Sequence, residues 1–334
     1  MTTTLTTLAV PQPKLLLTGR GATTHDVSRA IRRQCESGAL IRLGRGAYLA
    51  ASEWAALDDR ARLIARMRAV QARHSTPIVF CRDSAAAVLD YPAYGYFGAV
   101  PQAISRRPRQ STPELRWHRG SLDDDEIVEG DGFFITSPER TLWDIACAAP
   151  LARAVGMLDA GIRTLRPKDA AVSAPRVSRE QLLERVSTRS GKRGAVRAAR
   201  SIGFARDGAD SLGESLSRVQ EYLFGFEEPD LQVSVSDADG EIGVADQCWR
   251  DHRVLGEFDG YEKYTRNRYA HGTAPSEIVF REKVREDRMR ATGGGMARWL
   301  WADAHDGTRL AAILTRAGLP REPRPRESWR GMPH

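Results

Sequence analysis

The part of the sequence that most restricts the fold is a pair of strand-like runs in its second half. Residues Glu241–Trp249 and Val254–Asp259 carry apolar side chains at near-alternate positions, and the polar segment Arg250–Arg253 separates them. This pattern predicts an antiparallel β-hairpin. The flanking residues predict a helix over Leu212–Leu223, a strand over Leu231–Val235, a helix over Ser276–Thr292 and a last strand running into a helix within MARWLWADA.

The hairpin brings carboxylates to one face of the sheet. With the turn centred in Arg250–Arg253, Asp246 lies opposite Glu257, and Asp259 shares the face of Glu257 because side chains alternate along a strand. Opposed like charges are destabilising, so a cation is expected between them. A hard divalent ion suits such oxygen ligands, and the sequence therefore predicts Mg²⁺, with Mn²⁺ as a substitute, on Asp246 and Glu257.

Two alternatives to the metal site stay open. A register slip of one residue would turn Asp246 to the other face. The acids would otherwise form an exposed face in which Arg250 or Arg253 neutralises them.

Three more residues are candidates for catalysis in this region. Glu214 is the last residue of Ser211-Leu212-Gly213-Glu214, which reads as a capping box, and it is also placed to add a third carboxylate from the preceding helix. Lys263 and Lys283 are two of only five lysines beside 45 arginines. An ammonium with an adjustable pKa suits the orientation or deprotonation of a water molecule, although codon bias explains the rarity equally well.

Positive charge is concentrated in two blocks. The formal net charge is +7, yet residues 1–50 carry +5 and residues 163–206 carry +9, so the remainder is acidic. Two basic blocks predict surfaces for a polyanion, with DNA as the expected partner. The alternative is a solvated helix face and a linker.

The first basic block has the pattern of a winged helix. A helix capped by Thr23–Asp26 and ended by Gly38 precedes a hairpin that turns at Gly44–Gly46. A basic helix followed by a basic wing suits docking in a DNA groove, although the helix that normally comes before is not evident and the unit is also typical of interaction modules. The arginines expected on DNA are Arg29, Arg32, Arg33, Arg42 and Arg45, and Arg193, Arg197 and Arg200 in the second block.

Other features exclude whole classes of protein. No apolar run approaches the ~18 residues of a membrane span. The N-terminus lacks the basic start and apolar core of a signal peptide. The four cysteines contain no C-x-x-C pair, which argues against a zinc ribbon or a disulfide framework. We therefore expect a cytoplasmic protein without a membrane partner, and leave a protein partner or homodimer open.

The composition along the chain divides it into six segments. We expect an unstructured lead-in over 1–13, a winged-helix-like unit over 14–51, an α/β domain over 52–163, a basic linker and helix over 164–207, the sheet domain over 208–319 and an unstructured tail over 320–334.

Six blocks of the second half resemble a known family. DSLGESLSRV, PDLQV, IGVADQCW, VLGEFDGYEKY, FREKVREDRMRATGG and ARWLWADA are similar to the C-terminal domain of actinobacterial proteins related to the very-short-patch-repair endonuclease, in the PD-(D/E)XK superfamily. The resemblance implies a mixed sheet flanked by helices and Mg²⁺-dependent DNA cleavage. It implies Asp246 and Glu257 as metal ligands and Glu214 as the helix carboxylate. Asp259 stands where the superfamily has lysine, so Lys263 or Lys283 would supply the amine, another group would activate the water, or catalysis has been lost.

The first half resembles another family more loosely. Thr24–Tyr48 and ITSPERTLWDIA are similar to AbiEi-type antitoxins of abortive-infection systems, which implies a role in phage defence or a toxin–antitoxin pair. The sequence as a whole predicts an α+β or α/β protein with an N-terminal winged helix and a PD-(D/E)XK-like C-terminal domain. Its predicted function is that of a metal-dependent DNA endonuclease; the alternative is a non-catalytic, DNA-binding regulator or antitoxin with a degenerate nuclease fold.

Overall fold

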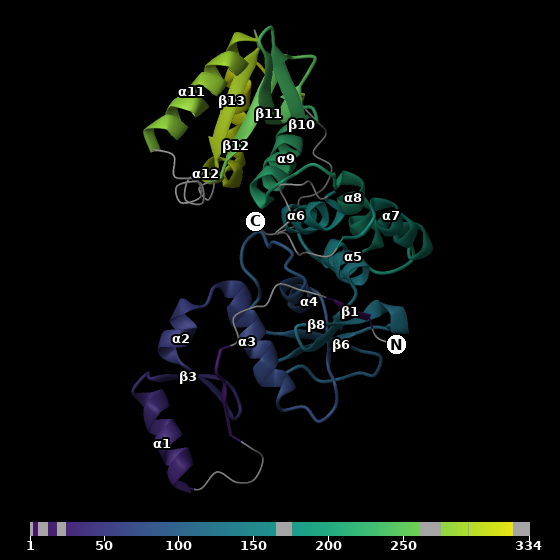
Figure 1. Ribbon diagram of the computed structural model, residues 1–334. Helices are drawn as coiled ribbons and strands as arrows, with labels where there is room; N and C mark the ends of the chain where they lie inside the picture. The colour runs from purple at the N-terminus through teal and green to yellow at the C-terminus, as the bar shows by residue number, and fades with distance from the viewer. Residues whose placement is uncertain are drawn as a thin grey trace. The chain divides into compact units, whose positions relative to one another are not determined.

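The computed structural model describes residues 3–5, 13–18, 25–164, 176–260, 275–292 and 294–322. The chain divides into two compact units that are interleaved in sequence (Figure 1). The first comprises Met1–Ala149 and Leu165–Gly203, and the second comprises Pro150–Thr164 and Phe204–His334. The expected segments 165–175 of the linker and 323–334 of the tail lie outside the described residues.

The first unit opens with a helix and a three-stranded sheet. Helix α1 (His25–Glu36) precedes the antiparallel strands β3 (Leu40–Gly44) and β4 (Ala47–Ala50), and β2 (Leu16–Leu17) pairs with the far side of β4. The backbone at Gly46 has φ +72°, a conformation that glycine adopts without strain. The predicted helix and hairpin are therefore present.

The rest of the first unit is built on a six-stranded mixed sheet. Its order is β1 (Thr3–Leu5), β8 (Ile127–Gly130), β9 (Phe133–Thr136), β5 (Val79–Phe80), β6 (Gln102–Ser105) and β7 (Arg116–Arg119). The helices are α2 (Ala51–Ala56), α3 (Asp59–Gln71), α4 (Asp83–Val88), η1 (Asp124–Glu126), α5 (Pro138–Ala148), α7 (Arg179–Thr188) and α8 (Ala195–Phe204). The prediction of an unstructured lead-in is wrong for residues 3–5, because their backbone pairs with β8.

The second unit is a four-stranded mixed sheet with helices. Strands β10 (Asp230–Asp237), β11 (Gly240–Trp249) and β12 (Val254–Asp259) are antiparallel neighbours, and β13 (Gly295–Leu300) pairs in parallel with β12. The helices are α6 (Leu151–Ile162), α9 (Leu212–Phe224), α11 (Pro275–Ala291), α12 (Trp301–His305) and α13 (Gly307–Arg316). The predicted mixed sheet with flanking helices is confirmed at this level.

Helices α9 and α11 cover opposite faces of this sheet. Met289 of α11 packs with Leu255 of β12, whereas Gly213 of α9 lies so close to Phe258 that a Cβ atom there would meet the ring at 2.0 Å. Leu255 and Phe258 point to opposite faces because side chains alternate along β12. The glycine thus sets the close approach of α9 to the sheet.

Helix α6 belongs to the second unit, although the sequence placed it in the domain over 52–163. Leu151 and Val155 pack against Val219 of α9. Arg218 of α9 forms a salt bridge of 2.8 Å with Asp159 of α6, and both side chains are 1% exposed. This buried contact holds α9 in place. No helix among the described residues is long and apolar enough to cross a membrane.

A candidate carboxylate site

The hairpin that carries the candidate carboxylates has the predicted register. Trp249 pairs with Val254, Cys248 with Leu255 and Gln247 with Gly256. The ladder ends one pair before Asp246 and Glu257.

Beyond the last pair of the ladder, the backbone N–H of Phe258 has a side chain as its acceptor. It donates a hydrogen bond of 2.9 Å to Oδ2 of the Asp246 carboxylate. Ala245 packs in the same cluster as Cys248, which breaks the alternation of side chains and turns Asp246 toward α9. Asp246 and Glu257 are therefore neighbours, but their carboxylates do not share one simple face.

Glu214 is the carboxylate that α9 contributes. Ser211 caps the helix, since its Oγ accepts a hydrogen bond from the Glu214 N–H at 3.2 Å. Glu214 is 2% exposed, and its carboxylate accepts hydrogen bonds of 2.8 Å from the Asp210 N–H and from the Ser211 hydroxyl. Burial, followed by the negative charge of Asp246, raises the pKa of Glu214 to about 7. The side chain thus exchanges its proton near neutral pH.

Gln232 of β10 joins the two carboxylates. Its Nε2 donates to Oε2 of Glu214 and to Oδ1 of Asp246, each at 3.3 Å. The backbone of Gln232 has φ +52°, and it is skipped in the ladder between Leu231 and Val233. A non-glycine residue in this left-handed region is strained, and such residues concentrate at functional sites. The irregular backbone directs the amide to the carboxylates.

Glu257 points away from α9 and toward α11, on the opposite face of the sheet from Asp246, and lies beside arginines. It is 5% exposed, and Nη2 of Arg285, from α11, lies 2.9 Å from its carboxylate. Arg298 of β13 approaches to 3.6 Å, because the parallel register places it opposite Glu257. Burial raises the pKa of Glu257 even though both arginines oppose the shift, and Asp246 adds to the rise.

Asp259 is neutralised by the same arginine. Arg298 donates to both of its carboxylate oxygens, at 3.0 and 2.9 Å, and also to Glu286 at 2.8 Å. The expectation that Arg250 or Arg253 neutralises the acids is wrong for these carboxylates: Arg250 pairs with Asp230, and Arg253 donates to the Thr292 carbonyl.

The lysines do not complete the site among the described residues. Lys283 is exposed on α11, and no hydrogen bond or ion pair links it to a described carboxylate. Lys263 lies outside the described residues. Likewise, the described residues contain no group of three or more His, Cys, Asp or Glu side chains gathered closely enough to hold a metal ion.

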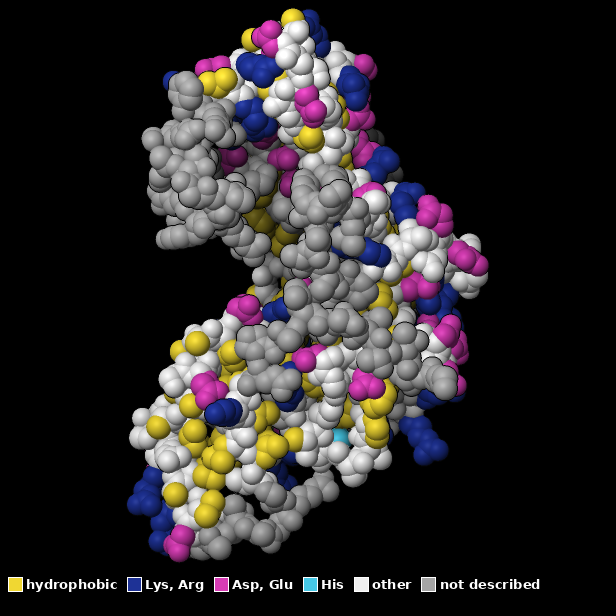
Figure 2. Space-filling model, in the orientation of Figure 1, with side chains coloured by type: hydrophobic (Ala, Val, Ile, Leu, Met, Phe, Trp, Pro, Cys, Tyr) yellow, Lys and Arg dark blue, Asp and Glu magenta, His cyan; other side chains and the backbone are white. Residues whose placement is uncertain are grey.

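The N-terminal arginines lie on an exposed surface of the first unit. Figure 2 shows basic side chains gathered over α1, where Arg29, Arg32 and Arg33 are exposed. Arg29 and Arg32 form ion pairs of 3.8 and 3.7 Å with Asp26 and Glu36 within the helix.

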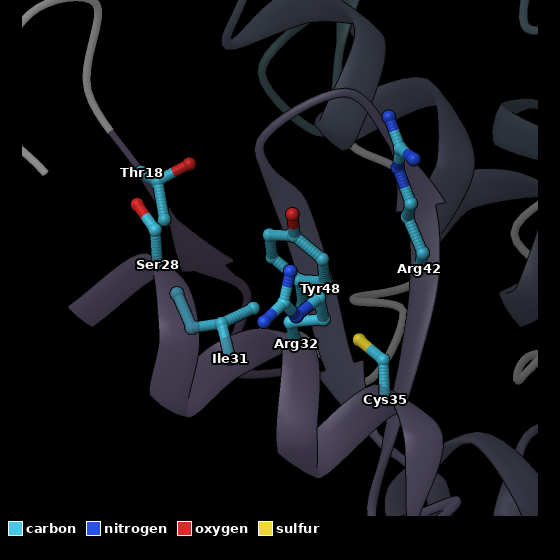
Figure 3. A pocket seen from close by; sticks show the side chains of 7 residues that line it. All are labelled: Thr18, Ser28, Ile31, Arg32, Cys35, Arg42 and Tyr48. Atoms are coloured by element: carbon cyan, nitrogen blue, oxygen red, sulfur yellow. The ribbon is translucent and has the colours of Figure 1, made fainter. Parts of the chain in front are cut away.

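A pocket of about 210 Å³ lies between α1 and the hairpin (Figure 3). It is lined by Ser28 and Arg32 from α1 and by Arg42 and Tyr48 from β3 and β4. Arg42 is exposed and its Nε donates to the Gly44 carbonyl at 3.3 Å. The pocket therefore joins two predicted DNA-binding arginines.

The arginines of the second block do not form one helix face. Arg193 precedes α8, and it is exposed, as is Arg200. Arg197 is half-buried, and its Nη1 donates to the Ala148 carbonyl at the end of α5 at 3.0 Å. Arg197 thus caps the C-terminus of α5.

Sequence reasoning missed three residues of the site: Gln232, Arg285 and Arg298. The ordinary alternation of β10 hides the irregular backbone at Gln232. Arg298 was within reach of sequence reasoning, because a strand that pairs in parallel with β12 places one of its residues beside Glu257.

Comparisons with known proteins name relatives but no activity. No protein-family profile matches the chain. The uncharacterized proteins Rv2248 and MT2308 of Mycobacterium tuberculosis are each 25% identical over 288 residues, which cover 85% of this chain and 94% of theirs. The crystal structure of the RV2827C protein from Mycobacterium tuberculosis aligns with a TM-score of 0.33 and 16% identity over 65% of this chain and 78% of that chain.

Proposed function

We propose that this protein is a metal-dependent DNA endonuclease and that its second unit has a PD-(D/E)XK-like fold. The observation that carries the proposal is the electrostatic position of Asp246. Burial is the main cause of the raised pKa of both Glu214 and Glu257, and the negative charge of Asp246, on the strand between them, adds to the rise in each. Glu214 and Asp246 thus share a negative potential that a bound cation would relieve, whereas Arg285 and Arg298 already lie beside Glu257.

The donors fit a hard divalent cation. They are carboxylate oxygens, which Mg²⁺ and Mn²⁺ prefer, and Mg²⁺ is usually held by one or two carboxylates with water. As the resemblance implies, Asp246 and Glu257 would hold the ion and Glu214 would act through water, and Glu257 would then exchange its contact with Arg285 for the ion. When bound, the metal supplies an activated water and neutralises charge on the phosphodiester.

The chain's own groups prepare this chemistry. Gln232 orients the carboxylates of Glu214 and Asp246 through its amide. Glu214, whose pKa is raised by burial and by Asp246, would accept or return a proton. Arg285 provides positive charge beside Glu257, and it would stabilise developing negative charge without acting as a base, since guanidinium stays protonated. Neither Lys263 nor Lys283 is needed for this assignment.

Cleavage of plasmid and single-stranded DNA tests the proposal. Purified full-length protein is incubated with Mg²⁺, Mn²⁺ or EDTA, alongside Asp246→Asn and Glu257→Gln. We expect metal-dependent nicking that both variants lose and that Asp251→Asn, an exposed carboxylate in the turn of the same hairpin, keeps. Absence of cutting with either metal, or full activity of Asp246→Asn, overturns the nuclease.

A second candidate function is DNA binding without cleavage. The exposed arginines of α1 beside the β3–β4 hairpin favour it, in the arrangement of a winged helix. Such a regulator or antitoxin would bind a specific site, and Arg32→Ala would abolish that binding while leaving any cleavage of non-specific DNA intact. The role in phage defence stays a prediction from the resemblance.

A further inference from the structure

The first unit carries a group of exposed arginines along one edge of its larger sheet. Strand β7 ends the sheet and pairs only with β6 among the named strands. The preceding loop folds back along it, since the Trp117 N–H donates to Ser111 Oγ at 2.9 Å and Thr112 bridges to Leu115. The loop therefore covers part of the strand edge that has no neighbouring strand. Covering such an edge is one way in which proteins prevent it from pairing with another chain.

The loop and strand carry four exposed arginines. No side chain among these four forms a hydrogen bond or an ion pair with another described residue: Arg107, Arg109, Arg116 and Arg119. Exposed arginines of the second unit differ, since Arg206 pairs with Glu228 and Arg250 with Asp230. The nearest acid in the loop, Glu114, is already paired with Arg73. The positive potential of the edge is therefore not cancelled locally.

One of these arginines is held in a fixed position. The Arg109 guanidinium lies 4.6 Å from the centre of the Trp117 ring, and His74 contacts the same ring edge-on at 6.3 Å. Stacking on an aromatic face restricts the guanidinium but leaves the N–H groups at its rim available. Arg119 shares the sheet face of Trp117 because it lies two residues further along the strand. Arg109 is thus prearranged to donate hydrogen bonds to a phosphate, and Arg119 lies on the same face of the strand.

The hairpin turn of the winged-helix-like part is attached beside this edge. The backbone N–H of Arg45 donates to Oε1 of Glu114 at 3.0 Å, and a Cβ atom on Gly44 would lie 3.3 Å from the Glu114 carboxyl carbon. The turn is therefore docked on the β7 loop, while the Arg45 side chain is exposed. The positive surface runs from Arg45 to the arginines of the edge.

We propose that this edge surface, formed by Arg45, Arg107, Arg109 and Arg119, binds the phosphate backbone of duplex DNA. Unpaired arginines complement regularly spaced phosphates, and planar guanidinium groups bind phosphate oxygens in pairs. The contacts are to the backbone, so the surface positions DNA without reading its sequence. The choice of DNA as partner rests on the proposed function, but binding to this surface needs neither the carboxylates nor a metal.

Fluorescence anisotropy with a labelled duplex of random sequence tests this surface. Full-length protein is titrated in EDTA at several salt concentrations, with Arg109→Gln/Arg119→Gln and the matched control Arg250→Gln/Arg309→Gln. Each lost phosphate contact lowers the slope of log K against log[salt] by about 0.9. We expect the edge variant to lose about 1.8 from that slope and to bind at least about fivefold more weakly, while the control matches the wild type.

The outcomes separate the two proposals. An edge variant with the affinity and salt slope of the wild type overturns the surface, and so does a wild-type protein that binds an acidic protein but no DNA. Equal melting temperatures of the edge variant and wild type show that the loss is not unfolding. If Asp246→Asn binds DNA normally and neither it nor the wild type cuts, the nuclease fails and the surface stands. If the wild type cleaves DNA and the edge variant binds DNA as tightly as the wild type, the nuclease stands and the edge surface is overturned.

Discussion

A buried glutamate in α9 makes the stability of the second unit depend on pH. Glu221 is 1% exposed and lies beside the Gln247 side chain of β11, and neither of its carboxylate oxygens has a hydrogen bond of normal geometry among the described residues. Burial raises its pKa from 4.5 to about 8, against the smaller opposing effects of Gln247 and Arg218. The folded protein therefore keeps this carboxyl protonated at pH 7.

The sign of the effect follows from proton binding. Between pH 4.5 and 8 the unfolded chain has released this proton and the folded chain has not, so the free energy of unfolding falls as pH rises. Each pKa unit corresponds to about 1.4 kcal/mol, so the whole window is worth roughly 5 kcal/mol. Below pH 4.5 the contribution is complete, and above pH 8 it is lost.

Glu221→Gln tests this reasoning because glutamine is neutral at every pH and has nearly the same shape. Urea unfolding of wild type and variant is measured at pH 5, 6, 7 and 8, and the variant is expected to gain on the wild type by up to about 1.4 kcal/mol per pH unit. Other titrating groups are common to both proteins and cancel. Glu241→Gln, an exposed position on β11, should follow the wild type. Parallel curves for wild type and Glu221→Gln would refute the buried, protonated carboxyl.

Three further expectations concern the site and its support. Arg218→Met leaves Asp159 buried without its cation, and we expect the free energy of unfolding to fall by about 3–5 kcal/mol in thermal or urea denaturation. Asp246→Asn removes a negative neighbour, so the pKa of Glu214 should fall from about 7, as measured by carboxyl NMR titration. Gln232→Gly should be more stable than Gln232→Ala by about 1 kcal/mol, because the backbone at this position has φ +52°.

Each expectation has an outcome that contradicts it. An unchanged unfolding midpoint for Arg218→Met would show that the buried pair is not needed. A Glu214 titration that is the same with and without Asp246 would remove the electrostatic basis of the proposed site. Equal stability of the glycine and alanine variants would mean that residue 232 is not strained.

Local sequence patterns were sufficient for the elements and for one register. The alternation in Glu241–Asp259 predicted strands β11 and β12 and their pairing, because a hairpin with a short turn has few possible registers. Ser211 predicted the start of α9, since capping depends on residues three apart. Helix α1 and the β3–β4 hairpin were likewise predicted from local signals, namely the capping residues of the helix and the glycine turn of the hairpin.

The neutralisation of the carboxylates was decided by tertiary structure. The sequence showed that Glu257 and Asp259 need positive charge, but Arg285 comes from α11 and Arg298 from β13, 28 and 39 residues further along the chain. A repeating pattern states which face a residue occupies and not which distant side chain arrives there. The metal that was expected from the sequence and the arginines found in the structure would both supply the positive charge that Glu257 and Asp259 need.

The same distinction explains the remaining differences. Gln232 reaches Glu214 and Asp246 only because its backbone is left-handed, a conformation that glutamine does not signal in a sequence. Helix α6 joined the second unit because its apolar face packs on α9, and an apolar face does not identify its partner. The sequence by itself determined the helices and strands, which face of each is apolar, and the negative charge of the carboxylates that the site must balance. Which residues meet was decided by long-range packing, since those contacts depend on segments far apart in the chain.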